Sequence, residues 1–372
     1  MKNAAVQLFE LGQSVWYDNI QRGLLENGEL AGMIERGEIY GVTSNPSIFM
    51  KAITKSTDYD ESLAKLNQSQ MDAEAVFFIL AIEDIQAAAD LFESLYKETQ
   101  GGDGYVSLEV SPYLADQTEE TIWQAKEIWQ RVDRPNLMVK IPATKAGLPA
   151  IEEAIFAGVN VNVTLIFSLG CYQEVMEAYI RGLERRVEAG LPLDSINSVA
   201  SFFVSRIDTN VDNRLQKIVD AKGSHTEKAK SLMGKAAIAS AKLAYKQYKA
   251  IFESDRFRKL AEKGANPQRP LWASTSTKNP AYRDVIYVEE LIGQDTVNTM
   301  PPHTLKAFLD HGVVEETLEA DFDAAQLAFN DLESIGISMD DVTAELLEDG
   351  VRAFADSFTE LLESIKSRRQ TV

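Results

Sequence analysis

The chain has 372 residues, of which 45% are hydrophobic and 25% are charged, as in ordinary globular proteins. Its net charge of -20 argues against nucleic acids and anionic membranes as main partners, and no apolar run approaches the length of a membrane-spanning helix. One cysteine excludes an intramolecular disulfide and fits a reducing, cytoplasmic location, while three widely spaced histidines argue against a metal site.

Short apolar runs alternate with amphipathic stretches along the chain. Strands are predicted at residues 14–18, 39–44, 105–110, 137–143, 160–166, 198–204, 271–274 and 296–300. Helices are predicted at residues 72–98, 117–131, 147–157, 169–189, 227–252 and 280–291. The alternation implies parallel strands with right-handed crossovers, and eight units favour a (β/α)8 TIM barrel over an open doubly wound sheet. No glycine-rich dinucleotide fingerprint follows the first strand, which also disfavours the open sheet.

Two segments are longer than a minimal barrel needs. Residues 46–104 and 206–269 are predicted to be helical insertions, because neither segment contains strands of its own. Residues 318–369 are acidic and predicted to be helical, and we expect Phe322 and Phe354, with Phe308 just before them, to pack back over the barrel. We therefore expect residues 1–372 to form a single domain.

Lys140 stands in the middle of an apolar strand-like run, between Val139 and Ile141. A lysine in a strand commonly extends to the surface or pairs with a carboxylate. A desolvated lysine can instead remain neutral, attack a carbonyl and form a Schiff base. The strand alone leaves both interpretations open.

Strand parity predicts which side chains share the barrel interior with Lys140. If Lys140 points inward, Val139 and Ile141 point outward to the helices, as apolar residues should. Applying the same alternation to the other strands gives one polar interior set: Asp18, Asn45, Glu109, Lys140, Asn162, Thr164 and Ser201. Such groups can merely satisfy one another and cap strand ends. A barrel core is normally filled by branched apolar side chains, however, so this many polar groups point to a functional site.

The chemistry of this set suits a lysine imine. Lysine attacks a ketone, one carboxylate moves protons while water is lost, and a second carboxylate deprotonates a hydroxyl to break a carbon–carbon bond. Amides and hydroxyls hold a polyhydroxylated substrate. The scheme requires no metal and no cofactor.

Several motifs then resemble those of the transaldolase family, in the family's order. They are GVTSNPS at 41–47, VSLEV at 106–110, VKIPAT at 139–144, NVNVTLIFS at 160–168, ASFFVSR at 200–206 and the segment 272–280. Each motif is modest alone, but together they span nearly the whole barrel. The resemblance implies transfer of a dihydroxyacetone unit from sedoheptulose 7-phosphate or fructose 6-phosphate to an aldose phosphate, in the non-oxidative pentose phosphate pathway.

The resemblance also implies roles for individual residues. Lys140 is implied as the Schiff-base lysine, Asp18 as the acid/base of cleavage, and Glu109 with Thr164 as the pair that positions the catalytic water. The substrate-binding residues implied are Thr43, Asn45, Asn162, Ser201, Phe203 and Arg206, with Ser201 and Arg206 at the phosphate and Phe203 as a pocket wall.

The segment 272–280 departs from the family pattern, because many relatives place an arginine there for the phosphate. Lys278 is the nearest cation in this chain and can bind phosphate as a point charge, or remain a solvated loop lysine. Arg206 has the alternative of an ion pair with Asp208 or another acid, and Asp18 that of a helix N-cap.

Two rival functions remain at this point. A fructose 6-phosphate aldolase would release free dihydroxyacetone, but such relatives are shorter and tend to carry tyrosine where Glu109 stands. A non-catalytic sugar-phosphate-binding barrel would not need Asp18, Glu109 and Lys140 together. The helix patterns fit either a monomer or a homodimer.

Overall fold

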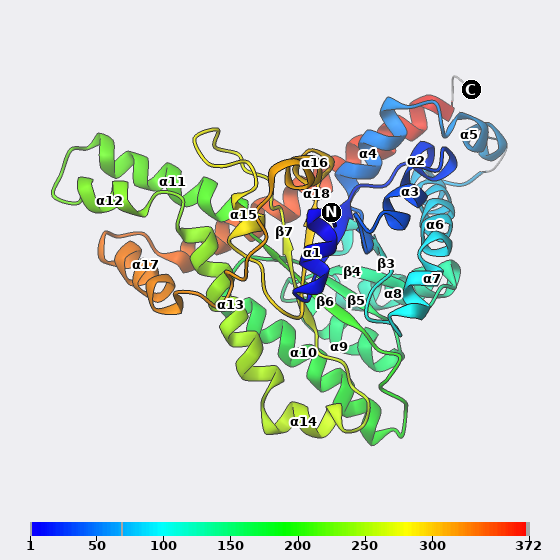
Figure 1. Ribbon diagram of the computed structural model, residues 1–372. Helices are drawn as coiled ribbons and strands as arrows, with labels where there is room; N and C mark the ends of the chain where they lie inside the picture. Colours follow the sequence, from blue (N-terminus) through cyan, green and yellow to red (C-terminus); the bar gives the residue numbers. More distant parts are fainter. Residues whose placement is uncertain (1, 68–69, 370–372) are drawn as a thin grey trace.

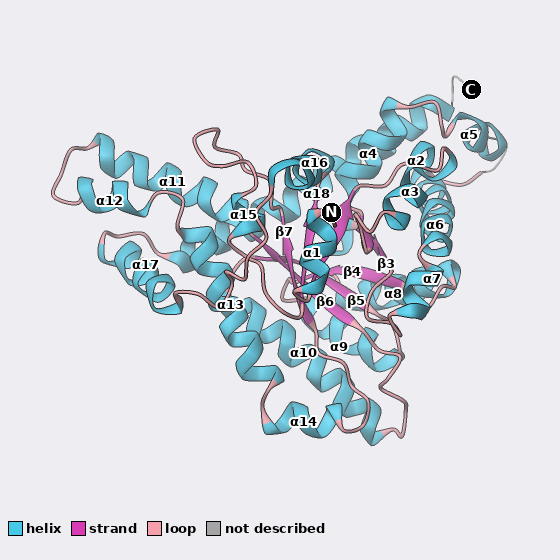
Figure 2. Ribbon diagram, in the orientation of Figure 1, coloured by secondary structure: helices cyan, strands magenta, loops and turns pink. Residues whose placement is uncertain are grey.

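The computed structural model describes residues 2–67 and 70–369 and contains a closed barrel of eight parallel strands in chain order. β8 pairs with β1 to close the ring, and helices surround the strands on all sides (Figure 1, Figure 2). The strands are β1 (Gln13–Asp18), β2 (Gly41–Thr43), β3 (Tyr105–Glu109), β4 (Leu137–Pro142), β5 (Val161–Ile166), β6 (Ser198–Phe203), β7 (Arg269–Ala273) and β8 (Thr296–Met300). The prediction of a (β/α)8 barrel is confirmed.

The helices fall into the barrel layer, two insertions and a C-terminal pair. Those up to β4 are α1 (Ala4–Glu10), α2 (Arg22–Glu26), α3 (Glu29–Glu35), α4 (Pro46–Lys55), α5 (Asp60–Leu66), α6 (Ala73–Leu91), α7 (Glu93–Glu98), the 3-10 helix η1 (Pro112–Leu114) and α8 (Thr118–Val132). Those between β4 and β7 are α9 (Gly147–Ala157), α10 (Leu169–Glu188), α11 (Ser205–Asp220), α12 (Thr226–Leu232), α13 (Ala236–Phe252) and α14 (Asp255–Ala261). The last are α15 (Ile286–Glu289), α16 (Pro302–His311), α17 (Phe322–Ser334) and α18 (Met339–Arg369).

Most predicted elements are confirmed, but several helical predictions were too long. The predicted helix at 227–252 is interrupted between α12 and α13, where Met233 is extended and Gly234 has a φ of +69°. Only the short α15 forms within the predicted helix at 280–291, because residues 274–285 make a loop instead. The predicted strand at 39–44 shrinks to the three residues of β2.

At the amino ends of the strands, polar side chains bond to one another and line a cavity of about 570 Å³. Asp103 accepts hydrogen bonds from Ser14 and from the Trp16 indole (2.8 Å), and it lies 3.4 Å from Arg269. The Trp16 ring lies beside Gly41 on the neighbouring strand, where an added Cβ would come within 2.7 Å of the ring. The predicted site residues lie at the opposite end of the barrel, where the strands have their carboxyl ends.

α18 crosses the barrel at the carboxyl ends of the strands. Figure 1 shows this helix (red) extending from the side of α11 and α17 to α4 and α5, which it contacts. Gly350 permits a close approach to Leu165, and Phe354 reaches the cavity above the strands, as its predicted packing over the barrel requires. Within the described ranges, no helix is both long enough and apolar enough to span a membrane.

Candidate active site

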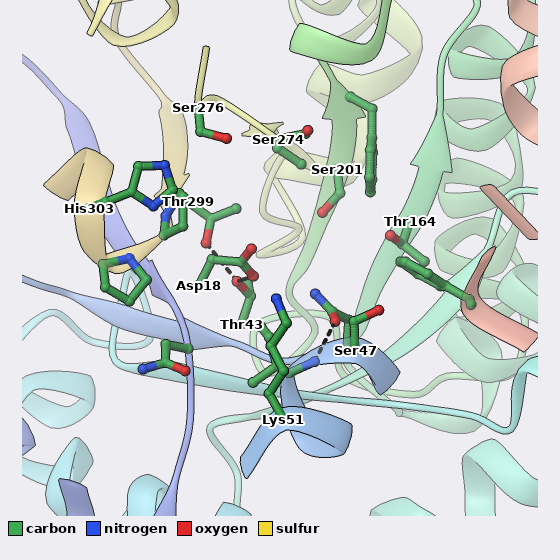
Figure 3. A pocket seen from close by; sticks show the side chains of 18 of the residues that line it. Asp18, Thr43, Ser47, Lys51, Thr164, Ser201, Ser274, Ser276, Thr299 and His303 are labelled. Carbon is green, nitrogen blue, oxygen red and sulfur yellow. Dashed lines mark hydrogen bonds between the residues drawn. The ribbon is translucent and has the colours of Figure 1, made fainter. Parts of the chain in front are cut away.

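A cavity of about 610 Å³ opens at the carboxyl ends of the strands. Nine of the eleven residues predicted to form the site line it: Asp18, Thr43, Asn45, Lys140, Thr164, Ser201, Phe203, Arg206 and Lys278. The other two, Glu109 and Asn162, are buried beside Lys140, each on a neighbouring strand at the same level as the lysine. Figure 3 shows the polar side chains converging on this cavity from opposite strands.

Lys140 lies inside the barrel, as parity predicted. Its side chain is 6% exposed, and its Nζ donates a hydrogen bond to the backbone oxygen of Ser44 (2.9 Å). The Glu109 carboxylate lies 3.5 Å from the same Nζ, longer than the 2.7–2.9 Å of a charge-assisted hydrogen bond. The alternative of a lysine extending to the protein surface is therefore wrong.

Glu109 is a buried carboxyl group poised to change protonation near neutral pH. Burial raises its pKa to about 7, and the nearby Lys140 ammonium only partly opposes this effect. Its Oε2 atom has no hydrogen-bond partner among residues 2–67 and 70–369. Oε2 is the atom that lies 3.5 Å from the Lys140 Nζ, so this ion pair leaves it without a hydrogen bond, and such atoms are typical of sites that bind a water or a reacting group.

Thr164 is the second buried polar group with an unpaired oxygen. Its Oγ1 has no partner in the described part of the chain. The next residue, Leu165, has a φ of +60°, and the pairing of β5 with β6 shifts register between Val163 and Ile166. Left-handed backbone at a leucine costs about 1–3 kcal/mol, and such strain concentrates at functional sites.

Asp18 ends β1 on the opposite side of the cavity floor. Its Oδ1 accepts a hydrogen bond from Thr43 (2.7 Å), and burial raises its pKa, opposed by that bond and by Lys140, Lys278 and Lys51. Helix α2 begins only at Arg22, and its N-cap position is Gln21. Asp18 is therefore not a helix N-cap.

The two asparagines occupy different places. Asn162 donates to Ser107 (3.0 Å) and accepts from Ser201 (2.7 Å), so it links three strands beneath the cavity. Asn45 caps α4 by accepting a hydrogen bond from the Ile48 N–H (3.0 Å), and its amide nitrogen has no bond of its own among the described residues. The Asn45 amide group is thus oriented by the helix while its nitrogen can reach a ligand.

A group of cations without carboxylate partners surrounds the mouth. Arg206 stacks over Phe203 (5.4 Å from the ring centroid) and forms no ion pair among the residues described. The alternative pairing with Asp208 does not occur, because Asp208 accepts from Tyr287 and from the Ala237 N–H. Burial lowers the pKa of Arg206.

Lys278 belongs to the same group of cations. Its Nζ donates to Ser276 (2.6 Å), and burial, with the nearby charges of Arg206 and Lys51, lowers its pKa. A lysine that lines the cavity and repels two other cations is not a freely solvated loop residue. The mouth therefore combines positive charges that an anion would neutralise.

Sequence reasoning missed some cavity residues. Lys51 and Lys55 extend from α4, which starts at the carboxyl end of β2 and therefore faces the mouth. The spacing of four residues between these lysines was the available signal. Thr299 lies on β8, where the parity rule would have found it, and His303 lies in the first turn of α16.

Comparison with known proteins gives a consistent result. The model of the transaldolase/fructose-6-phosphate aldolase family matches residues 15–365. A transaldolase of Thermobifida fusca is 48% identical over 96% of this chain and 96% of its own length. A transaldolase of Mycobacterium tuberculosis (strain H37Rv) is 48% identical over 97% and 95%. Transaldolase 2 of Streptomyces avermitilis is 46% identical over 100% and 98%.

Proposed function

The chain belongs to the transaldolase/fructose-6-phosphate aldolase family, and we propose that it transfers a dihydroxyacetone unit through an imine on Lys140. The donor is sedoheptulose 7-phosphate or fructose 6-phosphate, and the acceptor is glyceraldehyde 3-phosphate or erythrose 4-phosphate. The reaction belongs to the non-oxidative pentose phosphate pathway. The lone cysteine supports a cytoplasmic location. We regard residues 1–372 as one functional unit.

The main support for this assignment is that Lys140 is buried between two carboxylates, and that these two have different environments. Glu109 lies beside the Lys140 amine on the next strand, whereas Asp18 ends β1 across the cavity and is held by Thr43. A simple binding site for a sugar phosphate has no need of a buried amine with a carboxylate on each side.

In the first stage, the neutral Lys140 amine attacks the ketone carbon of the donor. The carbinolamine then loses its hydroxyl as water, and the product is a protonated imine. Glu109 accepts one proton from the attacking amine and passes it to the oxygen, and solvent supplies the second proton that this oxygen needs to leave as water. The unpaired oxygens of Glu109 and Thr164 support a water held at this point. In the reverse sequence, water attacks the imine of the new ketose and releases that ketose from Lys140. Hydrolysis before an acceptor has reacted would instead release free dihydroxyacetone.

In the second stage, the Asp18 carboxylate takes the proton of the C4 hydroxyl. The C3–C4 bond breaks, its electron pair moves into the protonated imine to give an enamine, and the remaining fragment leaves as an aldose phosphate. The enamine then attacks the aldehyde of the acceptor, and Asp18 returns the proton. Asn45 and Ser201, which line the cavity, bind the hydroxyl groups of the sugar, and Asn162 orients the Ser201 hydroxyl from beneath.

The cations at the mouth are the proposed phosphate site. Arg206 and Lys278 bind the phosphate, with Ser276 as a hydroxyl donor and Lys51 as an additional positive charge. These charges overcome, locally, the unfavourable field of a protein with a net charge of -20.

Borohydride trapping tests the assignment. After incubation with fructose 6-phosphate and reduction, peptide mass spectrometry should find a stable adduct on Lys140 and no adduct in a Lys140→Ala variant. An adduct on another lysine would refute the mechanism.

The acceptor then separates the transferase from the aldolase. Adding erythrose 4-phosphate should accelerate aldose release strongly if the enamine awaits an acceptor. Equal release of free dihydroxyacetone with and without acceptor would favour fructose 6-phosphate aldolase. Glu109 and the names of the relatives favour the transferase.

A further inference from the structure

Two threonine hydroxyls connect Asp18 to the last strand of the barrel. The Thr43 hydroxyl lies 2.7 Å from Oδ1 of Asp18 and 2.6 Å from the hydroxyl of Thr299 on β8. Both threonines are almost fully buried, with 2% and 3% exposure. The dashed lines in Figure 3 show this row of three side chains along one wall of the cavity.

The number of protons available determines which hydroxyl donates each hydrogen bond in this row. A hydroxyl has one proton to donate and two lone pairs that accept. The ionised Asp18 carboxylate can only accept, so Thr43 gives its proton to Asp18 and receives the proton of Thr299. Thr299 thereby fixes the rotation of the Thr43 hydroxyl, and each bond strengthens the next.

Asp18 has no other hydrogen-bond donor in residues 2–67 and 70–369. The charged groups that influence it are the Lys140, Lys278 and Lys51 cations and the Glu109 carboxyl. The orientation of the Asp18 carboxylate therefore depends on a single hydroxyl.

We propose that Thr299 is a positioning residue for the carbon–carbon cleavage step: through Thr43 it holds Asp18 aimed at the hydroxyl that Asp18 deprotonates. This inference rests on the proposed function, because it assigns Asp18 to cleavage and not to imine formation. Thr299 supports the proton-accepting group of one step only. Its removal should consequently affect the two steps unequally.

The test compares Thr299→Val with the wild-type enzyme, using fructose 6-phosphate and erythrose 4-phosphate. Valine has nearly the shape of threonine and removes only the hydroxyl. The rate of dihydroxyacetone transfer should fall about tenfold, whereas borohydride trapping at Lys140 should proceed at the wild-type rate. The low-pH fall in cleavage rate should move to higher pH, because a bond that favours ionised Asp18 is weakened.

Two further variants complete the design. Thr299→Ser restores a hydroxyl and should recover most of the transfer rate. Thr304→Val removes a buried hydroxyl (1% exposed) on α16 that has no partner in the described residues, and it should leave activity unchanged.

The possible results distinguish a failure of the positioning role from a failure of the proposed function. Wild-type transfer and an unmoved pH profile in Thr299→Val would overturn the positioning role. Equal losses in trapping and transfer would also overturn it, because the substitution would then have damaged the whole site. A wild-type protein that gives no adduct on Lys140 would instead overturn the proposed function itself, and this inference with it.

Discussion

Replacing Glu109 with glutamine is expected to remove a pH dependence centred near neutrality. Burial raises the pKa of this carboxyl to about 7, so that it is mostly protonated at pH 6 and mostly ionised at pH 8. A pKa of about 7 means that the ionised fraction is roughly tenfold larger at pH 8 than at pH 6. Because Glu109 must accept a proton during imine formation, kcat/KM should rise by a similar factor across this range.

The glutamine variant keeps the shape of the side chain but cannot accept the proton. Its kcat/KM at pH 8 should be about 10²- to 10⁴-fold lower, and the rise near pH 7 should disappear. The assay is the initial rate of transfer from fructose 6-phosphate to erythrose 4-phosphate between pH 5.5 and 8.5, with borohydride trapping as a measure of imine formation.

His303→Gln is the control for this experiment, because histidine is the other side chain that commonly changes charge near neutral pH and His303 lines the cavity mouth. A rise near pH 7 that persists in Glu109→Gln and vanishes in His303→Gln would refute the reasoning. So would a wild-type profile that is flat between pH 6 and 8.

Three further outcomes are expected. Lys278→Met should raise KM for fructose 6-phosphate about tenfold or more through loss of a charged contact, while Lys65→Met, a surface neutralisation on α5, should not change KM; equal steady-state parameters in the two variants would contradict the phosphate role. Gly41→Ala should lower the free energy of unfolding by about 1–3 kcal/mol in denaturant titrations, because its Cβ would meet the Trp16 ring; an unchanged midpoint would show that the ring can move. Because burial raises the pKa of Glu109 to about 7, the folded protein holds this proton more tightly than the unfolded chain. The resulting contribution to the free energy of unfolding is fully present below pH 4.5 and falls by about 3 kcal/mol as the pH rises through about 7. Glu109→Gln should therefore flatten the pH dependence of the free energy of unfolding between these values.

The alternation of side chains along the strands predicted which of them point into the barrel. Period-2 alternation placed Glu109, Lys140 and Thr164 inside the barrel, because each follows an unbroken alternating run up to its own position. The same rule fails immediately after Thr164. Leu165 adopts a positive φ, and the register of strand pairing shifts there. The sequence gives no signal of this change, because the residue is not a glycine.

The parts that sequence did not predict depend on tertiary packing. The sequence predicts a helix at residues 280–291, but only α15 forms there, and Tyr282 and Tyr287 bond to Asp212 and Asp208 on α11. These contacts hold the segment that follows Lys278, and they join residues 70 and 79 positions apart in the sequence. Lys51 reaches the cavity only because α4 starts where β2 ends, a relation that requires the fold first.

The charge distribution explains why these cations were left without partners. On the surface, Arg256 forms ion pairs with Glu177 and Glu184, as expected in a chain with 57 acidic residues. At the mouth, Arg206 and Lys51 both repel Lys278, and no carboxylate forms an ion pair with any of the three in the described ranges. An acidic partner would stabilise the empty protein but would have to be displaced by every incoming phosphate. Cations without ion-pair partners can therefore attract the substrate phosphate at full strength, although their mutual repulsion lowers the stability of the fold.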